Sequence, residues 1–460
     1  MNEIPAPPPL PAEPRPPFRL GRAGKLGLVG GLLLLLLVPH LMIEAVIGER
    51  ESYSEEVRRG VAQSWGQPQS LLGPVLMVPT RSAPTRPGVT ATMEPQRWET
   101  GYVAVLPTQL DAEVRLAPER RRRGLFEAVV YEAEAALSAT LSIPSIKVPD
   151  STELLWTQAF LVTGASDLRA AAGGARLSAD GRELVAGDAA DASCVGAELI
   201  RWELGLAGPP VPDQRLALQG SLALRGTGSF SLLPLARRAN LTVAAPWPTP
   251  SFQGAGLPVR ADINDSGFNA TWREGTGQAL VRNLSANWCQ GLVQAGMPVG
   301  VELLEAVPTY RMVTRASKYA AMFLALAFLT YVLFELVAAV RIHLVQYGLL
   351  GLSVVLFPLL LVAFGEPLGF AAAFAISAAA VVIQSSAYTA AVTRRPGLTG
   401  MFAAILTGLF AFLYVVLSLE AYALLAGTVA LFAALSAVMV VTRRVDWAGD
   451  DADAIGTALK

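Results

Sequence analysis

The sequence predicts a membrane protein with six transmembrane α-helices, one N-terminal and five C-terminal, and a large extracytoplasmic β-rich domain inserted after the first helix. Three observations favour this fold class. The 460 residues are 53% apolar and only 16% charged, with a mean hydropathy of +0.44, whereas soluble proteins carry about 25% charged residues. Residues 319–442 hold only six charged side chains in 124 residues. This low charge excludes a uniformly soluble protein and a disordered chain. The rest of the chain carries an ordinary share of charged residues, which excludes a pure helix bundle.

The first predicted transmembrane helix covers residues 26–47 and includes consecutive leucines from Leu32 to Leu37. A bilayer core requires about 20 mainly apolar residues per helix, and this run exceeds the roughly 7–15 apolar residues of a signal peptide. Because charged residues follow instead of a cleavage site, the sequence predicts an uncleaved anchor. The Pro-rich cytoplasmic tail over residues 1–25 should be extended or disordered. A docking peptide with a PxxP-like pattern is the alternative for this tail.

A five-helix transmembrane bundle is predicted over residues 319–442. The expected spans are 319–340, 344–364, 368–392, 398–418 and 421–442. Basic and acidic connections alternate between them, and basic residues favour the cytoplasmic side of a membrane. The alternation therefore predicts that residues 48–318 lie in the periplasm. Both termini are then cytoplasmic, including an acidic tail over residues 443–460.

Residues 48–318 have the pattern of a mainly-β domain. Alternating or β-branched residues between clusters of Pro, Gly, Asp and Asn indicate strands over residues 71–78, 101–106, 125–143 and 214–224. The run 125–143 has the pattern of a long strand pair, and we expect one or two antiparallel β domains. A helix over Glu51–Ser64 should extend the first span. The basic run Arg120–Arg123 is expected to be a solvated turn, with a phosphate or lipid site as the alternative.

Few residues in the sequence are suited to catalysis. The two histidines are His40, within the first span, and His343, at a predicted cytoplasmic membrane edge, so a Ser-His-Asp, Cys-His or His-rich zinc site in the β domain is excluded. The sequence also has no S-x-x-K motif and no phosphate-binding GxxxxGK[ST] loop. We therefore expect a non-enzyme without a cofactor or a metal. The net charge of -1, from 36 basic and 37 acidic residues, does not favour nucleic-acid binding.

Two groups of side chains remain as candidates for a functional role. Cys194 and Cys289 both lie in the predicted periplasmic domain, where they form either a disulfide or two buried free thiols. His40, Glu44 and Glu335 are ionisable residues inside predicted spans, where ionisable groups are costly. They either pair between helices or reach the interface, or they form a proton or ion relay.

Several short motifs follow one another along the chain. They are Ser64-Trp65-Gly66, Gly73-Pro74-Val75-Leu76, Arg123-Gly124-Leu125-Phe126-Glu127, Trp247-Pro248-Thr249-Pro250-Ser251-Phe252, Gly267-Phe268-Asn269-Ala270-Thr271-Trp272, Arg315-Ala316-Ser317-Lys318-Tyr319, Ile342-His343-Leu344-Val345-Gln346-Tyr347 and Thr442-Arg443-Arg444-Val445-Asp446-Trp447. With these motifs the chain resembles the CreD family of bacterial inner-membrane proteins, also described as cell envelope integrity proteins. The chain departs from the family at Leu344, where proline is usual, and at Ala421, where an acidic residue is usual.

The resemblance implies an inner-membrane protein with a large periplasmic domain and a role in envelope integrity. It also implies a link to a two-component regulatory response that is involved in β-lactam stress. No catalytic residue is carried over from the resemblance. We therefore expect a non-enzymatic protein that acts through its periplasmic domain, contacting the lipid bilayer and other envelope proteins or cell-wall components. The alternative is a small-molecule or ion transporter that uses the helix bundle, with Glu335 as the coupling group.

Overall fold

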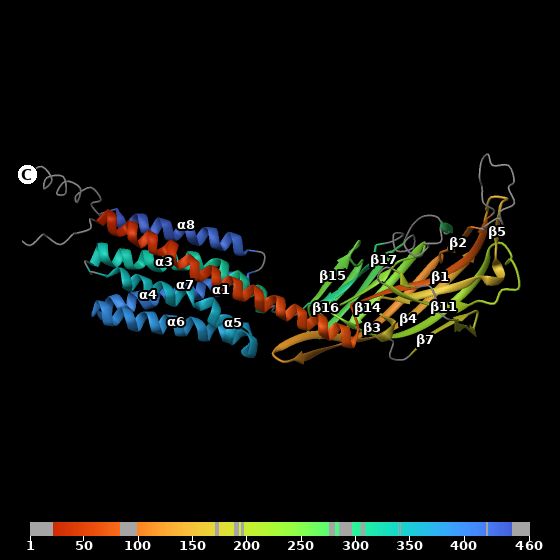
Figure 1. Cartoon of the computed structure of the whole chain (residues 1–460), viewed down its shortest axis with the longest axis horizontal. Helices are drawn as coiled ribbons and strands as arrows, with labels where there is room; N and C mark the ends of the chain where they lie inside the picture. The colour runs from red at the N-terminus through yellow and green to blue at the C-terminus, as the bar shows by residue number, and fades with distance from the viewer. Residues whose placement is uncertain are drawn as a thin grey trace, which may run out of the picture. The chain divides into compact units, whose positions relative to one another are not determined.

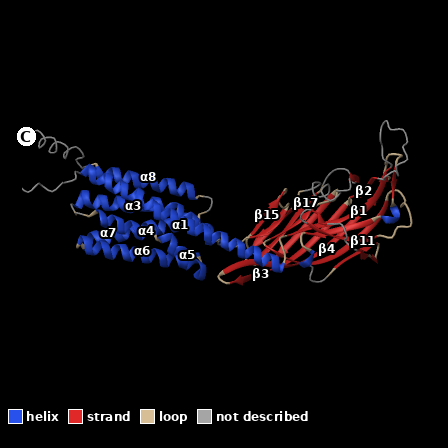
Figure 2. Ribbon diagram, viewed as in Figure 1, coloured by secondary structure: helices blue, strands red, loops and turns tan. Residues whose placement is uncertain are grey.

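The computed structural model describes residues 22–82, 99–170, 174–187, 193–194, 197–275, 281–284, 297–304, 309–338, 340, 342–419 and 422–443. The chain divides into two compact units. The helical unit comprises Met1–Glu51 and Val307–Lys460, and the β unit comprises Ser52–Ala306. Strands and long helices are segregated between the two units (Figure 2), as the sequence predicts.

The helical unit consists of apolar helices (Figure 1). Their bounds are α1 Arg22–Trp65, α3 Thr309–Ala338, α4 Leu344–Val355, α5 Phe357–Leu368, α6 Phe370–Thr393, α7 Pro396–Ser418 and α8 Ala423–Thr442. Among the described residues, five stretches are long and apolar enough to cross a membrane: Gly24–Trp65, Tyr310–Leu336, Leu344–Leu368, Phe370–Thr393 and Pro396–Ser418. Helix α8 carries a shorter apolar stretch, Leu425–Val440. Several apolar helices are therefore present, while a count of six complete spans remains a prediction.

Helix α1 is a single helix of 44 residues. The predicted extension of the first span over residues 51–64 is thus confirmed, and the β unit begins inside this helix, at Ser52. Helix α3 also begins earlier than its predicted span, at Thr309 rather than 319. The reason is that the polar turns before residue 319 contain no proline or glycine to stop the helix.

Helices α4 and α5 together make one candidate span, and Leu356 is the single residue between them. Pro358 stands at the second position of α5 and has no backbone N–H to donate to the preceding turn. The surrounding hydrogen bonds are kept, since Leu356 N donates to Leu352 O at 3.0 Å and Leu360 N donates to Leu356 O at 3.1 Å. The junction at Leu356 is therefore not an unwound segment.

The β unit contains two sheets. One has the strand order β10-β11-β6-β1-β13-β19-β15, with β2, β5, β9 and β18 pairing beside this path, and the other has the order β16-β17-β14-β3-β4-β12-β7-β8. The bounds of the first sheet are β1 Gln69–Ser82, β2 Glu99–Val105, β5 Thr152–Leu154, β6 Phe160–Ala165, β9 Val185–Gly187, β10 Ser193–Cys194, β11 Ala197–Glu203, β13 Ser229–Leu233, β15 Pro250–Gly254, β18 Val281–Leu284 and β19 Val299–Leu303. Those of the second are β3 Gln109–Arg123, β4 Phe126–Ile143, β7 Ala175–Ala179, β8 Arg182–Glu183, β12 Gln214–Thr227, β14 Arg238–Ala245, β16 Arg260–Asn264 and β17 Gly267–Glu274.

The four strand predictions, within 71–78, 101–106, 125–143 and 214–224, are confirmed by β1, β2, β4 and β12. The expectation of purely antiparallel pairing is wrong, because β1 pairs with β13 and β14 pairs with β3 in parallel. Both parallel pairs join strands far apart in the sequence. Residue alternation defines the two faces of a strand but not the direction of its neighbour, so the pattern could not reveal these pairs.

The β3–β4 hairpin corrects two further predictions. Residues 126–143 form one long strand instead of a strand pair, and the two-residue turn is Gly124-Leu125. Gly124 has φ +65°, which a glycine adopts without strain. The run Arg120–Arg123 is therefore exposed, as predicted, but it is the end of β3 and not a turn.

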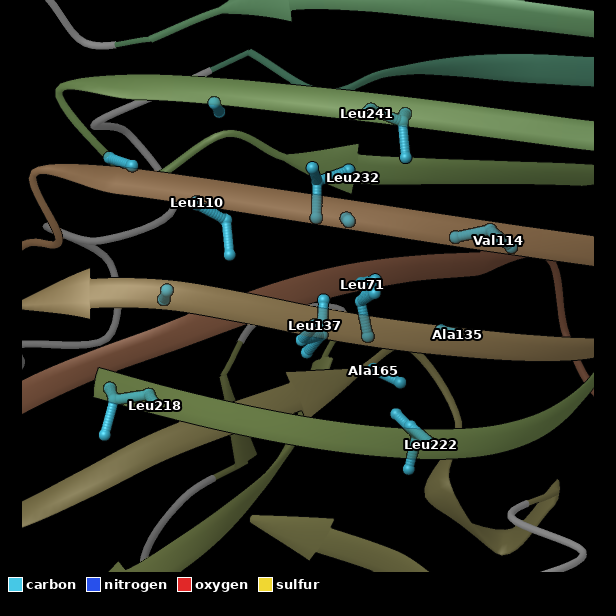
Figure 3. Close-up of a cluster of buried hydrophobic side chains, with 14 of the residues drawn as sticks. Leu71, Leu110, Val114, Ala135, Leu137, Ala165, Leu218, Leu222, Leu232 and Leu241 are labelled. Atoms are coloured by element: carbon cyan, nitrogen blue, oxygen red, sulfur yellow. The ribbon is translucent and has the colours of Figure 1, made fainter. Parts of the chain in front are cut away.

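The two sheets pack face to face around one apolar core, as in a β-sandwich. Leu71 of β1 and Leu232 of β13 come from the first sheet (Figure 3). Ala165 of β6 also comes from the first sheet, and the second sheet contributes the remaining members that Figure 3 labels, among them Leu110 of β3, Leu137 of β4 and Leu218 of β12. The opposite side chains of β4, β12 and β14 face solvent, since exposure alternates along these strands. The second sheet thus has one apolar face and one open, polar face.

Candidate functional site

Glu335, the predicted coupling group of α3, forms an ion pair with Lys25 of α1. The two side chains are 26% and 32% exposed. Lys25 Nζ also donates to the backbone oxygen of Ile342 at 2.7 Å, and the Tyr347 hydroxyl donates to Glu335 Oε2 at 3.4 Å. The pair therefore joins the start of α1 to α3 and to the segment before α4, which agrees with the expected pairing between helices.

His40 and Glu44 lie one turn apart on α1, with 3.8 Å between His40 Nε2 and Glu44 Oε1. The Ser317 hydroxyl of α3 donates to Glu44 Oε1 at 3.4 Å. His40 is 5% exposed, and its Nδ1 atom has no hydrogen-bond partner among the described residues. Lys25 and His40 are 15 residues apart on α1, about 22 Å along the helix. The structure thus places the three predicted residues at two separate positions and not in one relay.

An uncharged polar chain in the helical unit was not predicted. The hydroxyl groups of Tyr331 of α3 and Thr389 of α6 lie 2.7 Å apart. One turn away, Ser385 Oγ donates to Ser353 Oγ of α4 at 3.3 Å, and Ser353 Oγ donates to Gln384 Oε1 at 3.2 Å. These residues are dispersed over three helices and carry no charge, so neither a motif nor a charge pattern marks them in the sequence.

The predicted cysteine pair stays a prediction. Cys194 belongs to the two-residue strand β10, but Cys289 lies outside the described residues. No group of three or more His, Cys, Asp or Glu side chains is placed to hold a metal ion within the described parts of the chain.

The open face of the second sheet carries an arginine between two hollows. Arg115 of β3 is exposed, and it lies in register with Ala244 of β14 on one side and with Glu134 of β4 on the other. An open hollow of about 500 Å³ is lined by Arg115, Ala244, Asn269 and Asp262; its other lining residues are Leu116, Ala245, Pro246, Asn264, Ser266, Gly267 and Phe268. A second hollow, of about 290 Å³, has Arg115 on one side as well; its other lining residues are Leu116, Ala117, Glu132, Ala133, Glu134, Ala223 and Leu224.

We name this region, with Arg115, Asn269, Asp262 and Glu134, the Arg115 surface. Side chains paired across neighbouring strands share one face of a sheet and lie about 5 Å apart. The surface is therefore a rigid row of polar groups of both charges with hollows beside them. It can bind a polar ligand or a partner surface. Sequence reasoning missed it because its four residues come from four strands, β3, β4, β16 and β17, that only the sheet order brings together.

Asp167, in the loop after β6, is almost fully buried at 4% exposed. Burial alone raises the pKa of a carboxyl group, but here hydrogen bonds from Arg169 and from the backbone N–H of Gln67, with the charge of Arg169, lower the pKa of Asp167 below its usual value. Gln69 also donates to the Asp167 backbone oxygen at 3.2 Å. The carboxylate therefore ties this loop to the residues between α1 and β1.

A lowered pKa in the folded state stabilises the fold at pH values above the unfolded-state pKa, about 3.9 for Asp. We expect Asp167→Asn to lower the free energy of unfolding at pH 7 by about 1–3 kcal/mol, because it weakens the charged hydrogen bonds. The difference from the wild type should shrink as the pH falls from 5 to 3. Urea midpoints of the full-length protein in detergent measure the loss at pH 7 and its change with pH, with unfolding of the β unit detected by proteolysis. The exposed Asp150→Asn is the control, and an equal loss at pH 3 and pH 7 contradicts the prediction.

Comparison with known proteins gives a match to one family model over nearly the whole chain. The family model of "Inner membrane protein CreD" matches residues 22–448. A protein of Escherichia coli (strain K12) described as "Inner membrane protein CreD" is 30% identical over 427 residues, which cover 91% of this chain and 92% of that protein.

Two solved structures that match this chain do so at low sequence identity and low TM-score. The M1 zinc metallopeptidase from Deinococcus radiodurans is 9% identical over 47% of this chain and 53% of that chain, with a TM-score of 0.18. A two-domain M1 zinc metallopeptidase variant bound to L-tryptophan is 8% identical, over 47% of this chain and 54% of that chain, with a TM-score of 0.17. At these TM-scores the likeness says nothing about fold or activity.

Proposed function

Because this chain belongs to the CreD family of inner membrane proteins, we propose that it is a non-enzymatic protein of the cell envelope that acts through its β unit. The apolar helices hold it in the inner membrane as a multi-pass protein, with both termini in the cytoplasm. The β unit lies in the periplasm and binds an envelope protein or a cell-wall component. Through this binding the protein contributes to envelope integrity and to the response to envelope stress.

The Arg115 surface carries this proposal. It is the open face of a sheet whose other face is buried in the sandwich core, so the strands hold its polar groups in fixed positions. The sequence of the β unit contains no histidine, which removes the general base of most hydrolases. Binding therefore fits this surface better than catalysis does.

A photo-crosslinking amino acid in place of Asn269, on the Arg115 surface, tests the proposal in intact cells. Val185 of β9, 74% exposed in the other sheet, is the matched control position. We expect a crosslinked partner from position 269 that is absent from position 185 and at least fivefold weaker when Arg115→Gln is added. Equal products from both positions, or full resistance to envelope stress in the Arg115→Gln strain, contradict the proposal.

Transport by the helix bundle is a second candidate function, and the polar chain of Tyr331, Thr389, Ser385, Ser353 and Gln384 favours it. Polar side chains inside a helix bundle are costly in lipid and often line the route of a substrate. Transporters also have discontinuous helices at the binding site. The junction between α4 and α5 is not such a break, because its backbone hydrogen bonds are kept. We therefore place transport second.

Comparing Glu335→Gln with Lys25→Gln separates coupling from structural pairing. Both variants remove the same ion pair. If the pair only holds helices together, both variants should reach a similarly reduced abundance in the membrane, with unchanged resistance to envelope stress per molecule. Loss of resistance per molecule in Glu335→Gln alone would support transport and count against the β unit as the active part. Immunoblots of membrane fractions beside the stress assay provide both numbers.

A further inference from the structure

The turn of the β3–β4 hairpin presents an apolar and a basic side chain to solvent. Leu125 is 58% exposed, and the Arg122 side chain is 76% exposed. Arg122 pairs with Glu127 at 2.5 Å. Residues 119–127 contain four arginines and two glutamates, so the end of the hairpin is positively charged. We call Arg122, Gly124 and Leu125 the hairpin tip.

The hairpin is held against the final turns of α1, within the β unit (Figure 1). The rings of Tyr53 and Phe126 are 5.3 Å apart in an edge-to-face contact. Further along, Trp65 Nε1 donates to Tyr131 O at 3.3 Å, and the Arg121 guanidinium lies 3.8 Å from the Trp65 ring centroid. Strand β4 therefore follows α1 in the same direction over these residues.

Helix and strand geometry agree on this alignment. Tyr53 to Trp65 is 12 residues, about 18 Å of helix, and Phe126 to Tyr131 is five residues, about 17 Å of strand. The turn precedes Phe126, so the hairpin tip points along α1 toward the residues before Tyr53. The apolar run of α1 ends at Ile47, six residues before Tyr53 and about 9 Å away along the helix.

The headgroup layer on each side of a bilayer is about 5–8 Å thick. Only residues 48–52 of the chain separate Tyr53 from the end of the apolar run, so a tip beside Tyr53 is within reach of this layer when the apolar run crosses the membrane. Residues 50–59 of α1 carry three arginines and three glutamates, so the excess positive charge beside the bilayer comes from the hairpin. Leucine suits the boundary between headgroups and acyl chains, and arginine binds phosphate with paired N–H groups.

We propose that the hairpin tip is a phospholipid contact site, in which Leu125 enters the headgroup layer beside α1. Arg122, whose Nε and Nη2 face Glu127, binds a headgroup phosphate with the remaining N–H groups of Nη1 and Nη2. Arg121 then acts as a positioning residue, because its contact with Trp65 holds the hairpin against α1. The site requires only that α1 spans the bilayer, so it does not depend on the partner proposed for the Arg115 surface.

A fluorophore on Leu125→Cys, in full-length protein with Cys194→Ser and Cys289→Ser, tests the depth of the tip in lipid nanodiscs. The discs contain phosphatidylethanolamine and phosphatidylglycerol, with a headgroup-attached nitroxide lipid as the quencher. The control label is Val211→Cys, 72% exposed beside the opposite end of β4. We expect quenching at position 125 to be at least threefold stronger than at position 211. Equal quenching at the two positions overturns the proposal.

Charge reversal then tests the phosphate contact. Arg122→Glu should reduce quenching at position 125 at least twofold, while Arg215→Glu, an exposed arginine on β12 at the far end of the same sheet, should leave it unchanged. Quenching at position 125 that stays equally strong in Arg122→Glu overturns the role of Arg122. If the cysteine-free background does not fold, a benzoylphenylalanine at position 125 of the otherwise natural chain replaces the label. Lipid adducts found by mass spectrometry at position 125 and not at position 211 then support the site, and their absence at both refutes it.

Discussion

Trp272→Ala should lower the free energy of unfolding of the β unit by about 3–5 kcal/mol, the usual effect of truncating a buried tryptophan. Trp272 of β17 is fully buried. It packs edge to face on Phe252 of β15, with 5.5 Å between ring centroids, and so connects the two sheets. Proteolysis of the β unit in full-length protein should show a urea midpoint lower by roughly 1–2 M.

Trp272→Phe is the matched control for this prediction. The Trp272 Nε1 group has no hydrogen-bond partner among the described residues, and a buried donor without a partner is unfavourable. Phenylalanine removes this donor and keeps an aromatic ring for Phe252, so we expect less than half the loss seen with alanine. An equal loss in the two variants would mean that ring packing is not what Trp272 contributes.

Gly351→Leu should prevent close packing of α1, α3 and α4, with the largest effect of any single change that we expect in the helical unit. A Cβ atom at Gly351 would overlap the Leu36 side chain of α1 and would lie 2.8 Å from the Phe328 ring of α3. Small residues allow such close approach between membrane helices, and overpacking even by a methyl group costs about 1–3 kcal/mol. We expect at least a fivefold lower yield of monodisperse full-length protein after extraction in mild detergent.

Gly348→Ala, one turn away on α4, controls for the general effect of replacing a helix glycine. A Cβ at Gly348 makes only ordinary contact with Leu32, at 3.8 Å, and alanine favours the helix by about 1 kcal/mol over glycine. The yield should therefore be unchanged or higher. A normal yield of Gly351→Leu, or an equal loss in both variants, would contradict the close packing of these three helices.

The parts of the fold that follow from local pattern were predictable from the sequence. Apolar runs identify the helices, and alternation identifies β1, β2, β4 and β12. The pairing of strands could not be predicted from local pattern in the same way. Parallel pairing of β1 with β13 depends on residues 161 positions apart, such as Gln69 and Phe230, and no local pattern encodes such a neighbour.

The candidate sites also differ in whether the sequence alone reveals them. Glu335, Glu44 and His40 stand out in the sequence because ionisable residues are rare in apolar spans, and the structure adds Lys25 as the partner of Glu335. Arg115 does not stand out, because a lone arginine in an alternating strand is ordinary. Only the order β16-β17-β14-β3-β4 places Asp262, Asn269 and Glu134 in one row with it across the sheet.

The position of β19 in its sheet has a consequence for the order of folding. This strand is the last of the β unit in the sequence, yet it lies between β13 and β15 and pairs with both. The sheet cannot close until Val299–Leu303 has been synthesised, and α3 begins only a few residues later, at Thr309. Before that point β13 and β15 present open edges, which favour wrong pairing. The part of the first sheet formed by β13, β19 and β15 therefore stays incomplete until the chain is about to enter its second apolar helix.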